Sequence, residues 1–305
     1  MKKQKLLLSI FSKKTETTIL FGGFLVLFCL LLTFCEPVKE KEPTTGEIVT
    51  LVNDAVNLIN ENGESVFQDF NKEGSKWRKG DTYIFVANME GKFMVHPNPD
   101  LMNKDMLDLE DDSGKPIMKW FIQKAKCEKK GGWTHYQWKK QGEAKPSWKS
   151  TYIKLATAPS GEEFLVGCGV YDVKMEKEFA VEAVNEATLV MSTKGDSAAF
   201  DIFRDKTSHF LFKGTYIFVM DTAYILVVDP PFPDLEGVNV YEYQDANGKY
   251  LFQEFMTVAN EQGSGWIDYM WPKPGDTVQS AKSSYIKKVI IDDKQYIVGM
   301  GIYLD

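Results

Sequence analysis

The sequence predicts an α+β protein in which one module is used twice. The stretch from Thr82 to Pro97, TYIFVANMEGKFMVHP, returns without a gap at Thr215 to Pro230 as TYIFVMDTAYILVVDP. Apolar and other residues alternate in the first copy, and Asn88 to Gly91 separates its two runs, which is typical of two strands joined by a tight turn. Function is therefore expected inside a repeated β-hairpin module.

A long amphipathic helix is expected to open the first module. From Glu47 onward the apolar residues follow helical spacing, and Thr44 or Thr45 is available as the N-cap. The same spacing continues after Gly63 towards Asn71, which indicates that the helix bends or resumes there.

The rest of the first module is expected to hold a loop, a short helix and three strands. Asp105 to Asp112 is an acidic loop, and Lys115 to Cys127 has the apolar spacing of a helix. Strands are expected at 133–139, 148–157 and 164–171.

The second module repeats this order. A helix is expected around 174–205, then the hairpin, a helix at 248–260, and strands near Trp266, Tyr285 and Ile297. Sequential antiparallel strands with covering helices make an α+β architecture. The predicted modules are 47–173 and 174–305.

The first 34 residues are predicted to be a signal peptide or a signal anchor. Several lysines precede the apolar run from Ile19 to Phe34. Leu32-Thr33-Phe34-Cys35 resembles the lipobox of bacterial lipoproteins, although Phe34 departs from the small residue preferred before the cysteine. A lipidated Cys35 and an uncleaved anchor both stay open. Either one leaves residues 35–46 as a polar tether and the remainder exported, facing the periplasm or the cell exterior.

Composition and motifs exclude several function classes. The net charge of −7 argues against a nucleic-acid partner, which prefers a basic face. The three histidines have no metal-ligand spacing and no Cys-x-x-Cys occurs, so neither a metal nor a cofactor is expected. No catalytic motif is present, so no enzyme is expected, although an unrecognised hydrolase stays a weaker alternative.

Two further motifs have structural interpretations. Asp108-x-Glu110-x-Asp112 is similar to a calcium loop, but Ser113 and Lys119 stand where glycine and glutamate are required, which favours a solvated acidic loop. Cys127 and Cys168 are not matched by cysteines in the second copy, so no disulfide is needed, and Cys168 is expected to be a buried thiol.

The ordered motifs of residues 47–173 resemble the Cache family of extracytoplasmic sensing domains, most closely the type found in bacterial receptors for small organic acids. These motifs are Lys76-Trp77, Gly80-Asp81-Thr82-Tyr83, Gly91 with His96-Pro97, Asp112-Ser113-Gly114-Lys115, Gly132-Trp133 with Tyr136 and Trp138, Lys149 with Tyr152, and Gly167 with Gly169-Val170-Tyr171. The resemblance implies two tandem PAS-like modules, each a long N-terminal helix with a five-stranded antiparallel sheet.

The second module keeps most of these motifs but departs at two places. Asp229 stands where His96 stands, and Phe210 falls near the place of Trp77. A shared fold therefore does not imply a shared ligand, and a second module that binds nothing stays an alternative.

The resemblance also implies a pocket in the first module. An ammonium and an imidazole can neutralise a carboxylate, and tyrosine hydroxyls can complete its hydrogen bonds. For the aromatic residues core packing is the alternative, for Lys149 a solvated position, and for His96 a cap on the turn. The candidate ligand contacts are Trp77, Tyr83, His96, Trp133, Tyr136, Trp138, Lys149 and Tyr152.

The expected function is that of an exported, membrane-tethered sensor that binds a short organic carboxylate in the first module. Because the sequence stops at Asp305, after the last strand, signal transduction or chemotaxis would need a membrane partner such as a receptor or transporter. The alternative from another class is a surface lipoprotein scaffold for protein–protein contacts without a small ligand.

Overall fold

The computed structural model of the chain describes residues 42 to 304. The predicted signal or anchor, most of the tether and the candidate lipidation site Cys35 lie outside the described residues. Within residues 42–304, no helix combines the length and the apolar composition needed to cross a membrane.

Helix α1 (Thr45–Asn62) opens the first module as predicted. Thr44 is the N-cap: its side chain accepts a hydrogen bond from the backbone N–H of Glu47, and the Glu47 carboxylate accepts one in return from the backbone N–H of Thr44. This reciprocal pair satisfies two helix-end donors. Gly63 ends the helix with φ 64°, and a 3-10 turn (Gly63–Val66) and the short helix α2 (Phe67–Phe70) follow.

The first sheet is antiparallel and has the order β1-β2-β6-β5-β4, with β3 paired to β2. It contains one strand more than the five predicted, because two residues before Gly80 fold back onto β2. The strands are β1 (Arg78–Lys79), β2 (Thr82–Asn88), β3 (Phe93–Val95), β4 (Gly131–Lys139), β5 (Pro146–Thr157) and β6 (Glu163–Tyr171).

The second module repeats the order without the equivalent of β1. The helix predicted around 174–205 is two helices, α4 (Lys177–Lys194) and α5 (Asp196–Arg204), because Gly195 between them has φ 83° and ψ 167°, which is not helical. The sheet has the order β8-β7-β11-β10-β9. The strands of this sheet are β7 (Ile217–Asp221), β8 (Leu226–Val228), β9 (Ser264–Pro272), β10 (Gln279–Ile291) and β11 (Lys294–Tyr303). Helix α6 (Leu251–Gln262) lies between β8 and β9 in the sequence.

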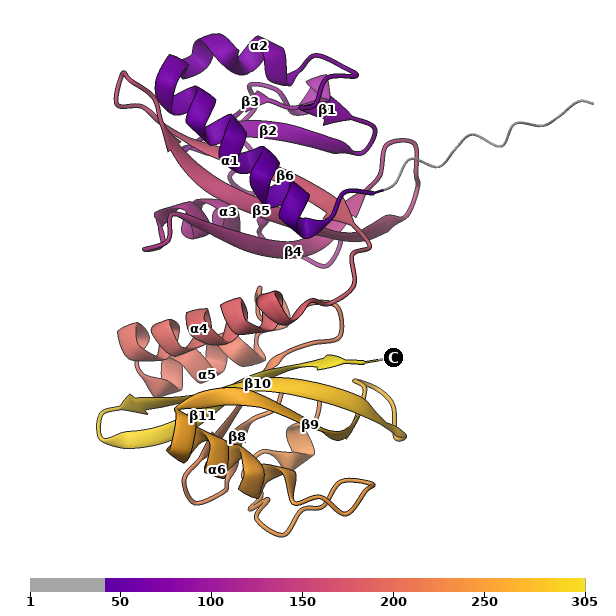
Figure 1. The fold of residues 1–305 in the computed structure, drawn as a ribbon, viewed down its shortest axis with the longest axis vertical. Coiled ribbons are helices and arrows are strands. Elements are labelled where there is room, and N and C mark those ends of the chain that lie inside the picture. The colour runs from indigo at the N-terminus through magenta and orange to yellow at the C-terminus, as the bar shows by residue number, and fades with distance from the viewer. Residues whose placement is uncertain (1–41, 305) are drawn as a thin grey trace, which may run out of the picture. The chain divides into compact units, whose positions relative to one another are not determined.

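The two faces of the first sheet are covered by different helices (Figure 1). Helix α1 contacts β5 and β6 on one face, and helix α3 (Ile117–Lys126) contacts β4 and β5 on the other. Side chains alternate between these faces. On β5, Tyr152 therefore packs into the core under α1, whereas Ile153 packs into the core under α3. The α+β class and the repeated module are confirmed.

Asp111 departs from the predicted solvated acidic loop. Its neighbours Asp108, Glu110 and Asp112 are exposed as expected, but Asp111 itself is buried. The Asp111 carboxylate accepts hydrogen bonds from the backbone N–H groups of Ser113, Lys115 and Gln137. Asp111 thus connects the turn before α3 to strand β4 through hydrogen bonds. This role could not be predicted from a segment in which most acidic residues are exposed.

Cys168 is buried, as predicted, and both it and Cys127 are free thiols. Burial raises the pKa of the Cys168 thiol to about 12. The thiol therefore packs as a small apolar group.

Replacing the N-cap of α1 tests the role of Thr44. Thr44→Ala removes the acceptor for the Glu47 N–H, which costs about 1 kcal/mol. We expect amide hydrogen exchange in the first turn of α1 to accelerate about fivefold in the full chain. Thr50→Ala is the control, because the exposed Thr50 hydroxyl donates only to the Gly46 carbonyl within the helix. Equal exchange in both variants would contradict the capping role.

Candidate functional site

Five of the eight candidate contacts gather on the α3 face of the first sheet. Strands β2, β4 and β5 supply them, together with the residue after β3. All but the half-buried Trp138 are buried. The five residues, which we call the donor cluster, are Tyr83, His96, Tyr136, Trp138 and Lys149.

Lys149 lies at the centre of the donor cluster and is only 1% exposed. Its Nζ donates to the Tyr83 hydroxyl at 2.9 Å and lies 3.4 Å from the Tyr171 hydroxyl. The same ammonium lies 4.2 Å from the centroid of the Tyr83 ring and 4.7 Å from that of the Tyr171 ring. No carboxylate of residues 42–304 forms an ion pair with it. Burial therefore lowers the pKa of Lys149.

A glycine on the neighbouring strand makes room for this lysine. A Cβ atom at Gly169 on β6 would lie 2.4 Å from Cε of Lys149. The second module has the same arrangement, because a Cβ at Gly301 would lie 2.2 Å from Cε of Lys282. In each sheet the lysine side chain thus extends over a residue that has no side chain of its own.

His96 is a neutral hydrogen-bond donor. Its Nδ1 accepts a hydrogen bond from the backbone N–H of Asn98 at 3.0 Å, so the proton of the neutral ring is assigned to Nε2. Burial, reinforced by the Lys149 ammonium, lowers the pKa of His96 to about 4. The ring lies edge-on to Tyr83, with 5.3 Å between centroids. His96 therefore caps the turn through one nitrogen and keeps the other as a donor.

The tyrosine hydroxyls complete the set. The Tyr83 hydroxyl accepts a hydrogen bond from Lys149, and burial raises its pKa. Because it is the acceptor in this bond, it can still donate its own hydrogen. The Tyr136 hydroxyl lies 2.9 Å from Oγ1 of Thr151. The donor cluster thus offers N–H and O–H groups and a positive charge, which suits an anion.

The other three candidates lie on the opposite face of the sheet. Trp133 and Tyr152 pack against each other, with 5.3 Å between ring centroids, and Trp77 packs against Phe70 of α2 at 5.0 Å. All three belong to the core under α1 or pack against it. Strand alternation separates Trp133 and Tyr152 from Lys149, and Trp77 lies directly before β1.

Sequence reasoning did not include Tyr171 and Thr151 among the candidates. Both are close to the donor cluster: Tyr171 pairs with Lys149 in the register of β5 and β6, and Thr151 lies two residues along the same face of β5. The signal was available, since residues two apart on a strand share a face.

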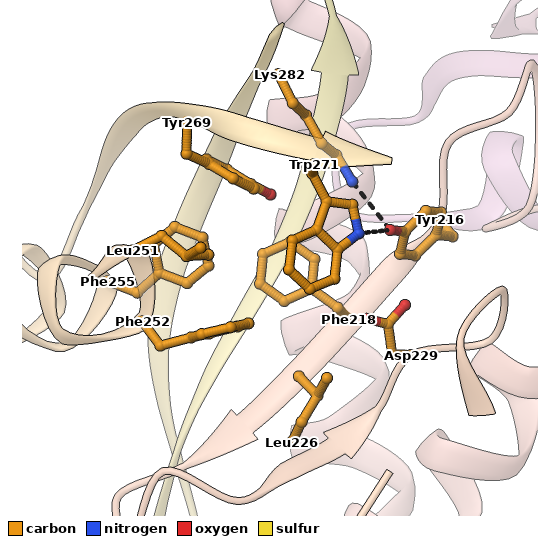
Figure 2. Close-up of a pocket in the computed structure, with 10 residues that line it drawn as sticks. All are labelled: Tyr216, Phe218, Leu226, Asp229, Leu251, Phe252, Phe255, Tyr269, Trp271 and Lys282. Carbon is orange, nitrogen blue, oxygen red and sulfur yellow. Dashed lines mark hydrogen bonds between the residues drawn. The ribbon is translucent and has the colours of Figure 1, made fainter. Parts of the chain in front are cut away.

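The second module contains a matching cluster, which lines a cavity (Figure 2). Nζ of Lys282 and Nε1 of Trp271 each donate to the Tyr216 hydroxyl at 3.0 Å. Asp229 lies beside them at the place of His96. Apolar and aromatic side chains form the rest of the wall, namely Phe218, Leu226, Leu251, Phe252, Phe255 and Tyr269.

Within residues 42–304, no group of three or more His, Cys, Asp or Glu side chains could hold a metal ion. The chemistry of the two clusters is that of buried lysines and hydroxyls. Side chains of these kinds can form hydrogen bonds with a small polar molecule and fix its orientation.

Adding a methyl group at Gly169 tests the packing of the lysine. We expect Gly169→Ala to lower the free energy of unfolding by about 1–3 kcal/mol, because the new Cβ displaces Lys149. In a Lys149→Ala background, Gly169→Ala should lower the free energy of unfolding by less. The difference between its effects in the two backgrounds, measured by urea unfolding of the full chain, should be about 0.5 kcal/mol or more. Gly46→Ala is the control, since a Cβ there meets no atom within 4 Å. Strict additivity would contradict the steric account.

The buried imidazole predicts a pH dependence. Because the pKa of His96 is lower in the folded chain, about 4 against an ordinary 6.5, the unfolded chain takes up the proton first as pH falls. Stability attributable to His96 is therefore complete above pH 6.5 and is lost towards pH 4. Between pH 7 and pH 4 we expect the free energy of unfolding to fall by about 3 kcal/mol more in the wild type than in His96→Asn, which keeps an acceptor for Asn98. Parallel pH profiles in urea unfolding would refute this.

Part of this chain is similar in sequence to a known protein. A sequence match to a methyl-accepting chemotaxis protein, McpP of Pseudomonas putida, has 31% identity over 90 residues, which is 30% of this chain and 16% of that protein. The chain thus spans only a small part of that relative.

Solved structures of domains from chemotaxis proteins are also similar to this chain. A periplasmic sensor domain of a chemotaxis protein matches with 33% identity and a TM-score of 0.35 over 42% of this chain and 90% of its own. The ligand-binding domain of the Pseudomonas fluorescens chemoreceptor CtaA, solved with L-serine, matches with 12% identity and a TM-score of 0.30 over 85% and 88%.

The family profile described as Cache domain matches residues 47–305, which covers both modules. Cache domains are sensory domains of membrane receptors and are not enzymes. The family predicted from the motifs is confirmed, and the chain belongs to the Cache domain family.

Proposed function

We propose that this chain is an extracytoplasmic sensor that binds a short organic carboxylate at the donor cluster of the first module. The observation that carries the proposal is the Lys149 ammonium, which is buried among hydroxyls and aromatic rings and forms no ion pair with a carboxylate of residues 42–304. A buried charge of this kind destabilises the folded chain unless a counter-ion binds beside it.

A carboxylate at this place would make charge-assisted hydrogen bonds. Lys149 supplies the ammonium, and the Tyr83 O–H and the His96 Nε2–H supply neutral donors. The bound anion would favour the charged form of Lys149 and so reverse the effect of burial on its pKa. Binding of the anion therefore supplies the favourable electrostatic interaction that Lys149 lacks in the empty site.

The surroundings favour a short hydrocarbon tail. The core under α3 is built from apolar and aromatic side chains, among them Phe85, Ile117 and Phe121. These offer dispersion contacts but no second charged group for a longer dicarboxylate.

The signalling role and the membrane attachment are parts of the same proposal. The match to a methyl-accepting chemotaxis protein supports signal transduction in chemotaxis. The basic and apolar N-terminal residues support attachment through a signal anchor or a lipidated Cys35, with a membrane receptor or transporter reading the bound state.

A thermal-shift screen of the full chain against short carboxylates, amines and amino acids tests the site. A ligand that binds only the folded chain stabilises it by about 2.7 kcal/mol at 100 times its Kd. We expect a short carboxylate to raise Tm and Lys149→Met to abolish that shift. Without ligand, Lys149→Met should be more stable by about 1–4 kcal/mol, because an unpaired buried charge is gone.

Lys282→Met is the matched control, since it removes the equivalent lysine of the second module and should leave the carboxylate shift intact. A screen that is flat for every class would favour the scaffold alternative. A carboxylate shift that survives Lys149→Met but disappears in Lys282→Met would move the site to the second module.

A further inference from the structure

Helix α3 covers the face of the first sheet that holds the donor cluster. The Phe121 ring of this helix packs edge-on against the Tyr136 ring, with 5.6 Å between centroids. Tyr136 in turn pairs with Lys149 in the register of β4 and β5. Since Lys149 is only 1% exposed, a molecule that reaches it from solvent displaces part of this cover. The position of α3 therefore affects access to the donor cluster.

The C-terminal half of α3 contacts the second module through a buried lysine. Nζ of Lys124 donates to Oε1 of Glu182 at 2.8 Å and to Oε2 of Glu186 at 2.5 Å, and both glutamates belong to α4. The Lys124 side chain is 9% exposed. Burial opposes its charge, but the two carboxylates outweigh this effect and raise the pKa of Lys124. We call these three residues the α3 latch.

Strand β4 of the first module also contacts the latch. Oε1 of Glu182 accepts a second hydrogen bond, at 2.9 Å, from the backbone N–H of Trp133. Gly132 makes room for this carboxylate, because a Cβ atom at Gly132 would clash with Oε1 of Glu182. The Glu182 carboxylate is thus held by both α3 and β4.

Another buried lysine joins the segment before α3 to the second module. Nζ of Lys115 donates to the backbone carbonyl oxygens of Ser208 at 2.9 Å and Leu211 at 2.5 Å. Lys249 has the same place in the second module, but its Nζ donates to the carbonyl oxygen of Asp268 on the sheet of its own module. Both ends of α3 therefore have contacts with the second module.

Helix α6 shows what α3 would be without its latch, because it is the repeat of α3 in the second module. Phe121 and Phe255 have equivalent places: each ring stacks on a phenylalanine of the sheet that the helix covers, with 5.5 Å between centroids in both modules. Three residues further on, the uncharged Val258 stands where α3 has Lys124. Since the second module reaches the same fold without this lysine, the lysine serves the contact between the modules.

We propose that α3 is a lid over the donor cluster and that the second module keeps this lid closed through the α3 latch, so that carboxylate binding in the first module is coupled to release of the latch. This inference rests on the proposed function of the donor cluster. Because only molecules with an open lid can bind, the closed latch lowers the apparent affinity of the first module. By linkage, a bound carboxylate weakens the contact between α3 and α4 by the same factor.

Amide hydrogen exchange of the full chain without ligand tests the latch itself. Glu186→Gln keeps the size of the side chain but removes a charge that holds Lys124, and we expect exchange in α3 to accelerate about tenfold. Glu182→Gln serves if Glu186→Gln does not fold. Lys119→Met is the matched control, because Lys119 lies on the same helix but pairs with Asp108 of its own module at the surface. Exchange in this control should stay within about twofold of the wild type.

Isothermal titration of the same variants with acetate and propionate tests the coupling. We expect Glu186→Gln to bind the tighter of these probes about fivefold more strongly than the wild type does. Lys119→Met should bind it as the wild type does, and Lys149→Met added to Glu186→Gln should abolish binding. A gain of affinity separates a lid from a purely structural contact, because loss of a structural contact weakens a binding site.

Three results would overturn the proposal. Unchanged exchange in α3 of Glu186→Gln would mean that the latch does not hold the helix. Equal or weaker binding by Glu186→Gln, still abolished by Lys149→Met, would leave the proposed function standing without a lid. Binding of neither probe by the wild type or by any latch variant would overturn the proposed function and the coupling together.

Discussion

A buried ammonium on an inner strand is the constraint on which the rest of each module depends. Lys149 and Lys282 lie on β5 and β10, between strands on both sides, and each is removed from water. Such a charge persists only if its neighbours compensate for lost hydration. The compensation comes from Tyr83 on β2 in one module and from Tyr216, directly before β7, in the other, and a glycine on β6 or β11 provides the space.

The order of elements could be predicted because it depends on local patterns. Helical and strand periodicity indicated α1, α3, α6 and both hairpins, and the structure confirms them. Two details could not be predicted because they depend on single backbone conformations. Gly195 divides the helix of the second module, and Gly80 lets β1 fold back onto β2. Asp111 escaped for a different reason, since an acidic run looks solvated until the backbone donors around it are known.

The candidate site was only partly accessible from the sequence. The family resemblance supplied residue types, but it did not assign them to the two faces of the sheet. Alternation along β4 separates Trp133 from Tyr136, and along β5 it separates Tyr152 from Lys149. The exchange of His96 for Asp229 was visible in the sequence. The unsatisfied oxygen of Asp229 was not, because burial and missing partners are properties of the tertiary structure.

The conservation of the lysine, its tyrosine and its glycine across both copies confines the chemical difference between the clusters largely to one position. Histidine and aspartate are specified by codons that differ in the first base alone. After a module has been duplicated, a single nucleotide change at this position replaces a buried imidazole by a buried carboxyl group, while the lysine, the tyrosine and the glycine around it stay as they were. Two copies of one module can therefore present two chemically different clusters after one such change.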